Sequence, residues 1–190
     1  MTSAKSAHAA LRAGTAECHE QVDNIFSLVN LGDRAEYGRF LLAQAAAFIP
    51  VEQALNAAGA GDILPDWDQR QRGGLLRKDL GALGLGLPDM NPAVGIMPDF
   101  GNAAAVLGGV YVLEGSRLGG TLLSRSVATG FPKNFLGSGN SSLWRRLLAM
   151  LDERLNTVGD QRTAIDAARG VFKIFAHAGR QLPEKAAIAG

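Results

Sequence analysis

His19 is the side chain in this sequence that is best placed to bind a metal ion. It lies three residues before Val22 on the apolar stripe of a helix predicted over residues 5–26, which puts the imidazole on the inward face. Asp23 follows one turn later, where its carboxylate can accept the Nδ1 proton and leave Nε2 free for a metal. Arg12 lies about 10.5 Å back along the axis, within reach of a carboxylate on a bound ligand. This spacing fits an iron-bearing disc with an acidic edge, and the alternative is a hydrogen-bonded core histidine.

Glycine is concentrated in residues 102–129, a segment whose pattern is otherwise helical. Each glycine inside a helix costs about 1 kcal/mol relative to alanine, so this density needs a physical reason. Gly108, Gly115 and Gly119 share one face and leave a strip of bare backbone along it. Close packing of two helices is one explanation, but alanine would serve a polypeptide partner nearly as well. We therefore expect a flat, rigid ligand on this strip, with a bend at Gly119-Gly120 that opens space above it.

Other kinds of site find no support in the sequence. It contains no H-E-x-x-H, no C-x-x-C and no paired Glu-x-x-His, which are patterns of metal sites built from protein ligands alone. Residues 73–78 do not form a phosphate-binding loop, and residues 114–118 lack the second glycine of a hydrolase elbow. His8 is expected in solvent near the N-terminal end, and His177 receives no role.

Composition narrows the partners and the compartment. The 19 basic and 18 acidic residues nearly balance, so no broad positive field favours a nucleic acid or an anionic membrane. Cys18 is the single cysteine, and the first thirty residues hold no apolar segment of signal-peptide length, so we expect a cytoplasmic protein. The longest apolar run, 103–113, is too short to cross a bilayer, for which about 20 residues are needed.

The elements that position these residues are predicted to be helices throughout. Apolar residues recur with a period of 3.6 residues, and no segment sustains the alternation of a strand. The length fits one domain over residues 1–190, with 183–190 as a frayed tail. Ser3 or Ser6 is expected to cap the first helix. Further helices are expected from Asp33 to about Leu55 with a kink at Pro50, around Leu75–Leu83, over 102–129, over about 143–155, and from about Thr163 onward, with loops at 59–68 and 84–99.

Two motifs resemble those of haem oxygenases. Leu11-Arg12-Ala13-Gly14-Thr15-Ala16-Glu17-Cys18-His19, with Val22-Asp23 after it, resembles the proximal helix, in which the histidine binds the iron. Tyr111-Val112-Leu113-Glu114-Gly115-Ser116-Arg117-Leu118-Gly119-Gly120 resembles the distal helix of the bacterial branch that supplies biliverdin to bacteriophytochromes. Weaker similarity extends through 67–84, Trp144 and the Phe172 region, so nearly the whole chain is covered.

The resemblance implies a single-domain helical fold with haem between the first helix and a kinked distal helix. It further implies oxidation of haem to biliverdin, carbon monoxide and iron, with O₂ and electrons from a ferredoxin- or flavoprotein-type donor. His19 would be the axial iron ligand, and Gly115, Ser116 and Gly119 would form the catalytic distal segment. The residues expected to contact haem are His19, Arg12, Tyr111, Gly115, Gly119, Gly120, Phe172 and Arg145.

One departure from the family pattern keeps alternatives open. Well-known members have aspartate after the first distal glycine, whereas this chain has Ser116, which also donates and accepts hydrogen bonds. A haem carrier or sensor without turnover is therefore the second hypothesis, and a helix-packing interaction protein is the third. The thiamine-degrading relatives of the fold use acidic and cysteine residues that find no match here. Arg117 and Arg125 are expected mainly as solvated charges. Arg146, like Arg145, either reaches a haem propionate or is solvated, and Phe26 either lines the pocket or packs in the core.

Overall fold

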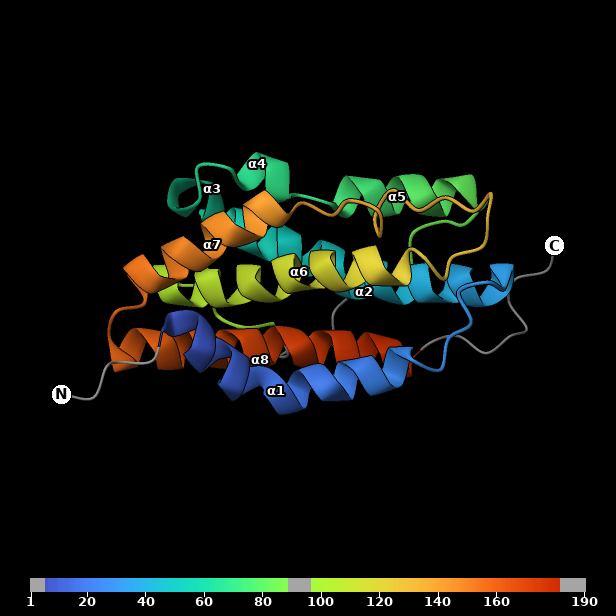
Figure 1. Cartoon of the computed structure of the whole chain (residues 1–190). Coiled ribbons are helices and arrows are strands. Elements are labelled where there is room, and N and C mark those ends of the chain that lie inside the picture. Colours follow the sequence, from blue (N-terminus) through green and yellow to red (C-terminus); the bar gives the residue numbers. More distant parts are fainter. Residues whose placement is uncertain (1–5, 89–96, 182–190) are drawn as a thin grey trace.

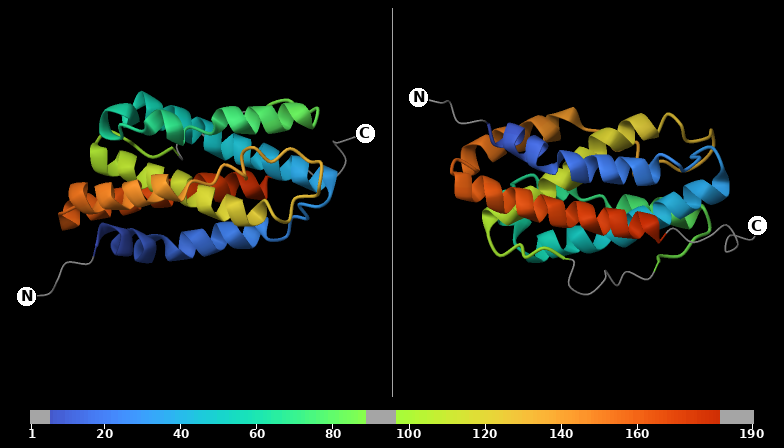
Figure 2. Two further views of the ribbon diagram at one scale, coloured as in Figure 1. Left: turned by 45° about the horizontal axis from the view of Figure 1, so that its top comes forward. Right: turned by 90° about the horizontal axis from the view of Figure 1, so that it is seen from below.

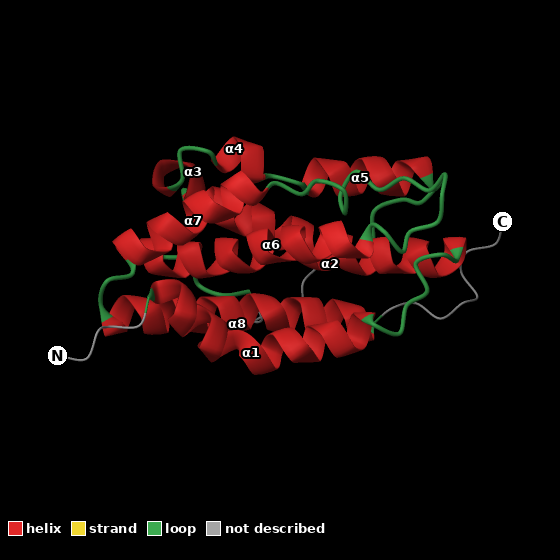
Figure 3. Cartoon of the chain, in the orientation of Figure 1, coloured by secondary structure: helices red, strands yellow, loops and turns green. Residues whose placement is uncertain are grey.

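The computed structural model describes residues 6–88 and 97–181, and every regular element within these ranges is a helix (Figures 1 and 3). This confirms the all-α class. The helices are α1 (Ala7–Phe26), α2 (Arg34–Ala57), α3 (Ala60–Ile63), α4 (Trp67–Arg70), α5 (Gly73–Ala82), α6 (Ala103–Leu123), α7 (Ser141–Arg154) and α8 (Val158–Arg180). Ser3, half of the expected loop at 84–99, and the expected tail at 183–190 lie outside the described residues.

Short polar side chains begin the long helices, as the sequence predicts for two of them. Ser6, Asp33 and Asn102 each accept a hydrogen bond from the backbone N–H three residues further on, at 3.2, 2.9 and 3.0 Å. Each bond satisfies one of the amides that a helix leaves without an internal partner in its first turn. Ser6, and not Ser3, is thus the cap of α1, and Asp33 caps α2.

Helix α8 lies between α1 and α6 and packs extensively on both. Figure 2 shows α1 and α8 side by side, and both run in the same direction: Gly14 faces Ile165, and Gly179 faces Ile25 further along the pair. Helix α6 also runs in this direction (Figure 1). α1 packs mainly on α8 and makes a smaller contact with α7. The side of α1 that faces the second half of α6 therefore makes few contacts with other helices.

The predicted loop at 59–68 is wrong in detail, because it contains the single-turn α3 and the beginning of α4. Tertiary contacts order this segment. Leu64 is buried, and the indole N–H of Trp67 donates to Asn56 Oδ1 at 3.1 Å.

Two helix boundaries also differ from the prediction. α8 begins five residues earlier than Thr163, because Thr157 caps it and accepts from the amide of Asp160 at 3.1 Å. The Thr163 hydroxyl instead bonds back to the Gly159 carbonyl inside the helix. α6 ends at Leu123 and not near residue 129, because the chain forms turns directly after Leu123. Pro50 lies within α2, which continues through it.

Three of the five α6 glycines serve packing. A Cβ on Gly108 would collide with the backbone of Ala164 in α8. On Gly109 it would collide with Phe100 and Leu55, and on Gly120 it would come into van der Waals contact with Leu136 at 3.4 Å. The prediction of one ligand-facing strip is therefore wrong for Gly108, where two backbones approach closely. The strip is reduced to Gly115 and Gly119.

None of the helices in the described ranges is both long and apolar enough to cross a membrane.

Candidate functional site

The first halves of α1 and α6 meet around Tyr111. Tyr111 of α6 is hydrogen-bonded to Thr15 of α1, and Thr15 is only 3% exposed. The ring of Tyr111 also lies 6.2 Å from that of His8 and 5.6 Å from that of Trp144. Burial raises the pKa of Tyr111, against the lowering effects of this hydrogen bond and of the Arg12 charge. This cluster closes one end of the space between the two helices.

One helical turn beyond this contact, His19 and Gly115 occupy equivalent positions on the two helices. Each lies four residues after its partner in the Thr15–Tyr111 pair, and both helices rise in the same direction. A Cβ placed on Gly115 or on Gly119 would meet no atom within 4 Å. The space in front of these two glycines is thus open, whereas α6 is tightly packed one and two turns earlier. An imidazole on one side and uncovered main chain on the other define the candidate site.

The imidazole of His19 is oriented by two neighbours. Its Nδ1 lies 3.1 Å from Asp23 Oδ2, and its ring meets the edge of Phe172 with 5.8 Å between centroids. This is the pairing that the sequence predicts, and it leaves Nε2 available. The expected inward orientation is wrong: the side chain of His19 is 63% exposed, because Leu11 and Thr15 take the buried face of α1.

The fit to a haem group rests on these features. Nε2 of a histidine whose Nδ1 is held by a carboxylate is a suitable axial ligand for iron. The space that side chains would fill at Gly115 and Gly119 admits a flat macrocycle close to the backbone. Among the described residues, no group of three or more His, Cys, Asp or Glu is arranged to hold a metal ion by itself.

The remaining predicted contacts divide into two groups. Phe172 lies under His19, and Arg12 is exposed near Tyr111, so the structure brings both to the site. Gly120 does not face the open space, since Leu136 covers it. Arg145 is exposed on α7, with no interaction that joins it to His19 or to the two open glycines.

Ser116 does not present a free hydroxyl to the open space. Its Oγ donates to the Leu113 carbonyl at 2.7 Å and accepts from Arg72 Nη2 at 2.8 Å. The hydroxyl is therefore engaged on the side of α6 that faces α5.

Two further expectations are corrected by the structure, and one open alternative is decided. Arg117 is 4% exposed and not solvated, because it pairs with Glu114 at 3.1 Å. His8 is half-buried against two aromatic rings and not free in solvent. Phe26 packs edge-on against Phe40 of α2, at 5.5 Å between centroids, which favours the core over the pocket. Arg125 is exposed, as expected.

The sequence reasoning missed a buried ionic network behind α6. Glu114 pairs with Arg117 and, at 3.1 Å, with Arg70 of α4. Arg70 also binds Asp66 at 2.6 Å, and Asp66 binds Arg146 at 2.9 Å. The available signal was Glu114 itself, a carboxylate at the end of the longest apolar run, since a buried charge of this kind requires a cationic partner. It does not say which arginine is the partner.

Arg72 is a further buried residue that the sequence did not point to. It is 1% exposed, and burial lowers the pKa of its guanidinium to about 9, with Arg117 acting in the same direction and Glu114 and Glu52 opposing it. The group thus remains protonated at neutral pH while fully removed from water.

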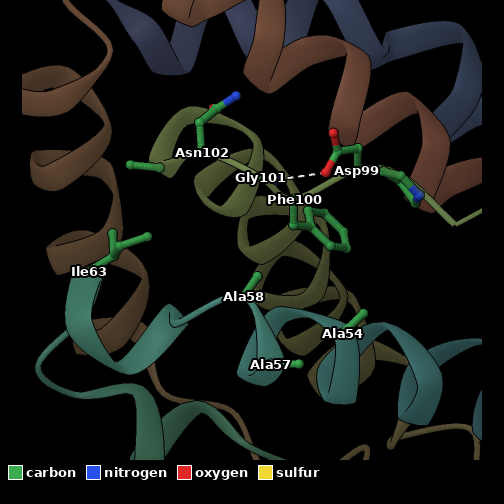
Figure 4. Close-up of a pocket in the computed structure, with 10 residues that line it drawn as sticks. Ala54, Ala57, Ala58, Ile63, Asp99, Phe100, Gly101 and Asn102 are labelled. Carbon is green, nitrogen blue, oxygen red and sulfur yellow. Dashed lines mark hydrogen bonds between the residues drawn. The ribbon is translucent and has the colours of Figure 1, made fainter.

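A separate pocket of about 570 Å³ lies at the beginning of α6, away from the open glycines (Figure 4). Its floor is made of small apolar residues of α2, and Asp99 accepts from the amide of Gly101 at its rim. It contains none of the residues of the candidate site.

The comparisons with known proteins agree with this geometry. A protein named heme oxygenase from Xanthomonas campestris pv. campestris (strain 8004) is 32% identical over 116 residues, which cover 57% of this chain and 67% of that protein. The fold matches a crystal structure of the NO- and CO-bound heme oxygenase from Neisseria meningitidis with a TM-score of 0.80 and 22% identity, over 98% of this chain and 96% of that one. No family model matches the sequence. The identity to the first relative, over two thirds of its length, shows that the chain belongs to the heme oxygenase family.

Proposed function

We propose that this protein binds haem between α1 and α6 and oxidises it to biliverdin, carbon monoxide and ferrous iron. The proposal is supported by the open space in front of the uncovered backbone at Gly115 and Gly119, together with the register that places His19 at the matching position on α1 with its Nδ1 paired to Asp23. Haem is the substrate and supplies its own iron for O₂ activation, with electrons from a ferredoxin- or flavoprotein-type donor.

His19 acts as the axial ligand in this proposal. The Asp23 carboxylate holds the Nδ1 proton and so fixes the tautomer whose Nε2 lone pair would bind the iron. Phe172 supports the imidazole through an edge-on ring contact.

Gly115 and Gly119 act by having no side chain. A methyl group at either position would occupy the open space, so glycine allows the α6 backbone to lie close to the macrocycle. The close backbone would then confine the reaction to the edge of the macrocycle nearest to it. Ser116, held by Arg72, belongs to this catalytic segment as part of its framework.

The carboxylates at the edge of haem require cationic side chains at the entrance of the site. Arg12 is exposed near the Tyr111 end of the site and is our candidate for one carboxylate. Arg145 of α7 is the second candidate.

We further propose that the chain acts as a single domain, in the cytoplasm, within the branch that supplies biliverdin to bacteriophytochromes. Support for this branch comes from the 111–120 motif and its serine at position 116. Transfer of the pigment to an apo-bacteriophytochrome, seen as red-shifted absorbance of the receptor, tests this role.

A haem carrier or sensor is the second candidate, and a specific observation favours it. The Ser116 hydroxyl is committed to Leu113 and Arg72, so it replaces the missing aspartate only indirectly.

Titration with hemin followed by reductant and O₂ tests both candidates. An oxygenase gives a Soret band that decays as biliverdin absorbance and carbon monoxide appear, whereas a carrier keeps its Soret band. Absence of any Soret band in the wild type would refute both. His19→Ala is expected to lose axial ligation, and an unchanged haem spectrum in that variant would refute the ligand assignment, with His177→Ala as the matched control.

A further inference from the structure

Arg72 reaches α6 beside the open glycines from outside the predicted site. Its Nη2 donates to the Leu113 carbonyl and, at 2.8 Å, to Ser116 Oγ. Ser116 directly follows Gly115, so the guanidinium contacts α6 within one turn of the open backbone.

The position of Arg72 is fixed by its own main chain. Glu52 of α2 accepts from the amides of Arg72 and Gly73, at 2.5 and 3.0 Å, and so anchors the beginning of α5. A Cβ on Gly73 would lie 2.6 Å from Glu52 Oε1, so glycine permits this close approach.

Two phenyl rings hold the guanidinium itself. Its central carbon lies 4.7 Å from the ring centroids of both Phe48 and Phe135. Phe135 is anchored in turn, because its amide donates to Asp79 at 2.8 Å. Nε and Nη1 of Arg72 are buried without a hydrogen-bond partner, which leaves the two bonds to α6 as the directional bonds of the side chain.

The Leu113 carbonyl is an unusual target for such a donor. In a regular helix it accepts from the amide four residues on, and here Ser116 Oγ and Arg72 Nη2 also reach it. Side-chain donors that compete for a mid-helix carbonyl fix or bend the helix at that point. Beyond this point Gly119 and Gly120 give α6 little stiffness of its own.

We infer that Arg72 is a positioning residue for the reaction: through Leu113 and Ser116 it fixes the Gly115–Gly119 backbone opposite His19. This inference rests on the proposed function for its role in haem oxidation, but the restraint on α6 exists in the ligand-free protein.

Arg72→Met, Arg72→Lys and Ser116→Ala test the inference. Methionine keeps apolar packing between the two phenyl rings but removes the donors, and lysine keeps a charge and a donor. Arg162→Met, at an exposed arginine of α8, is the matched control.

Amide hydrogen exchange of the ligand-free protein is the first measurement. Arg72→Met should exchange the amides of residues 115–120 about tenfold faster without a matching change in α8, and Arg72→Lys should restore part of the protection. Ser116→Ala should give a smaller change in the same direction. Equal protection in Arg72→Met and Arg162→Met would overturn the inference, whatever happens to the melting temperature.

The C–O stretching frequency of the ferrous CO complex is the second measurement, because it reports the polar environment beside α6. It should shift in Arg72→Met, return toward the wild-type value in Arg72→Lys, and stay unchanged in Arg162→Met. A frequency that is the same in all four proteins would refute the positioning role. If the wild type binds no haem, the proposed function fails, whereas the exchange experiment still decides on the restraint.

Discussion

His19, the proposed iron ligand, is held by a small number of contacts. The side chain of His19 is 63% exposed, so no close packing fixes the ring on its outer side. Asp23, four residues further along the same helix, is the group that sets its tautomer, and Asp23 is itself 65% exposed. The Asp23 bond thus matters for ligand strength more than for folding, since exposed pairs contribute little to stability.

Asp23→Asn should therefore weaken haem binding with little effect on the ligand-free protein. Loss of the charged acceptor makes the imidazole a weaker donor ligand, and loss of such an outer partner lowers metal affinity about 10–100-fold. Hemin titration measures this change. Glu20→Gln, at an exposed neighbour on α1, is the control, and equal affinities in the two variants would contradict the role of Asp23.

At the scale of elements, α6 has two functional sides. One side carries the open glycines, and the other carries Glu114 and Arg117, which tie the helix to α4. Anchoring on the far side lets a helix keep its place while its near side stays bare. The glycines of α6 should consequently respond to substitution in opposite ways.

Gly115→Ala should stabilise the ligand-free protein and impair the site. The new methyl group meets no atom, so alanine gains about 0.5–1 kcal/mol of helix stability. The same methyl group occupies space that we assign to haem, so hemin affinity should fall. Urea unfolding and hemin titration of one preparation check both effects, and a variant that gains both stability and affinity would contradict the assignment.

Gly108→Ala should have the opposite effect on folding. Its methyl group would collide with the Ala164 backbone, so α6 and α8 must separate along their interface. Overpacking of this kind lowers the free energy of unfolding by about 1–3 kcal/mol. Urea unfolding beside Gly115→Ala measures the contrast, and equal stability of the two variants would show that the close contact is unimportant.

The link from Asp66 to Arg70 should make stability depend on acid pH. Burial raises the pKa of Asp66, but the hydrogen bond and charge of Arg70, with Arg146, outweigh it and hold the pKa below its ordinary value of 3.8. The unfolded chain therefore binds the proton more tightly than the folded one. The contribution of the ionised Asp66 to the free energy of unfolding is complete above pH 3.8. It is lost as the pH falls through the lower pKa that Asp66 has in the folded protein.

Asp66→Asn removes this contribution. Its free energy of unfolding should be lower by about 1–3 kcal/mol at neutral pH, because Arg70 loses a charged partner. The difference from the wild type should narrow as the pH falls below 3.8, and urea unfolding at several pH values measures it. Asp68→Asn, at an exposed carboxylate nearby, is the control, and a gap that stays constant with pH would exclude the linkage.

At the scale of the whole molecule, the two walls of the site belong to differently supported parts. α1 rests on α8, and the second half of α6 is held from behind by α4, by Arg72 at the start of α5 and by the segment that follows α6. A ligand between His19 and Gly115 would join these parts across a space that the protein leaves unfilled. Its binding should stabilise the entire fold.

Hemin should thus raise the melting temperature in proportion to the logarithm of its free concentration. When the free hemin concentration is one hundred times the dissociation constant, the free energy of unfolding rises by about 2.7 kcal/mol. Thermal unfolding over a series of hemin concentrations measures it, and His19→Ala should need more hemin for the same shift. A melting temperature independent of hemin would be incompatible with a site that spans both walls.

The sequence by itself determined the features that depend on neighbours along the chain. Helical period, the cap at Asp33 and the His19–Asp23 pair are all set within one or two turns, where spacing in sequence fixes spacing in space. For the first helix the sequence offered two caps, and the structure identified Ser6. The high density of glycine in α6 likewise indicated that some neighbour approaches the backbone of this helix closely.

Only the tertiary structure decided what each side chain of α6 meets. Gly108 and Gly115 share a face of one helix, yet one touches α8 and the other touches nothing, because α8 covers only part of that face. Arg117 is buried for the same reason: the backbone of α4 approaches it from a distant part of the chain, in addition to Glu114 one turn earlier on α6. Contacts of this kind depend on how separate helices pack, and the periodicity of a single helix does not contain that information.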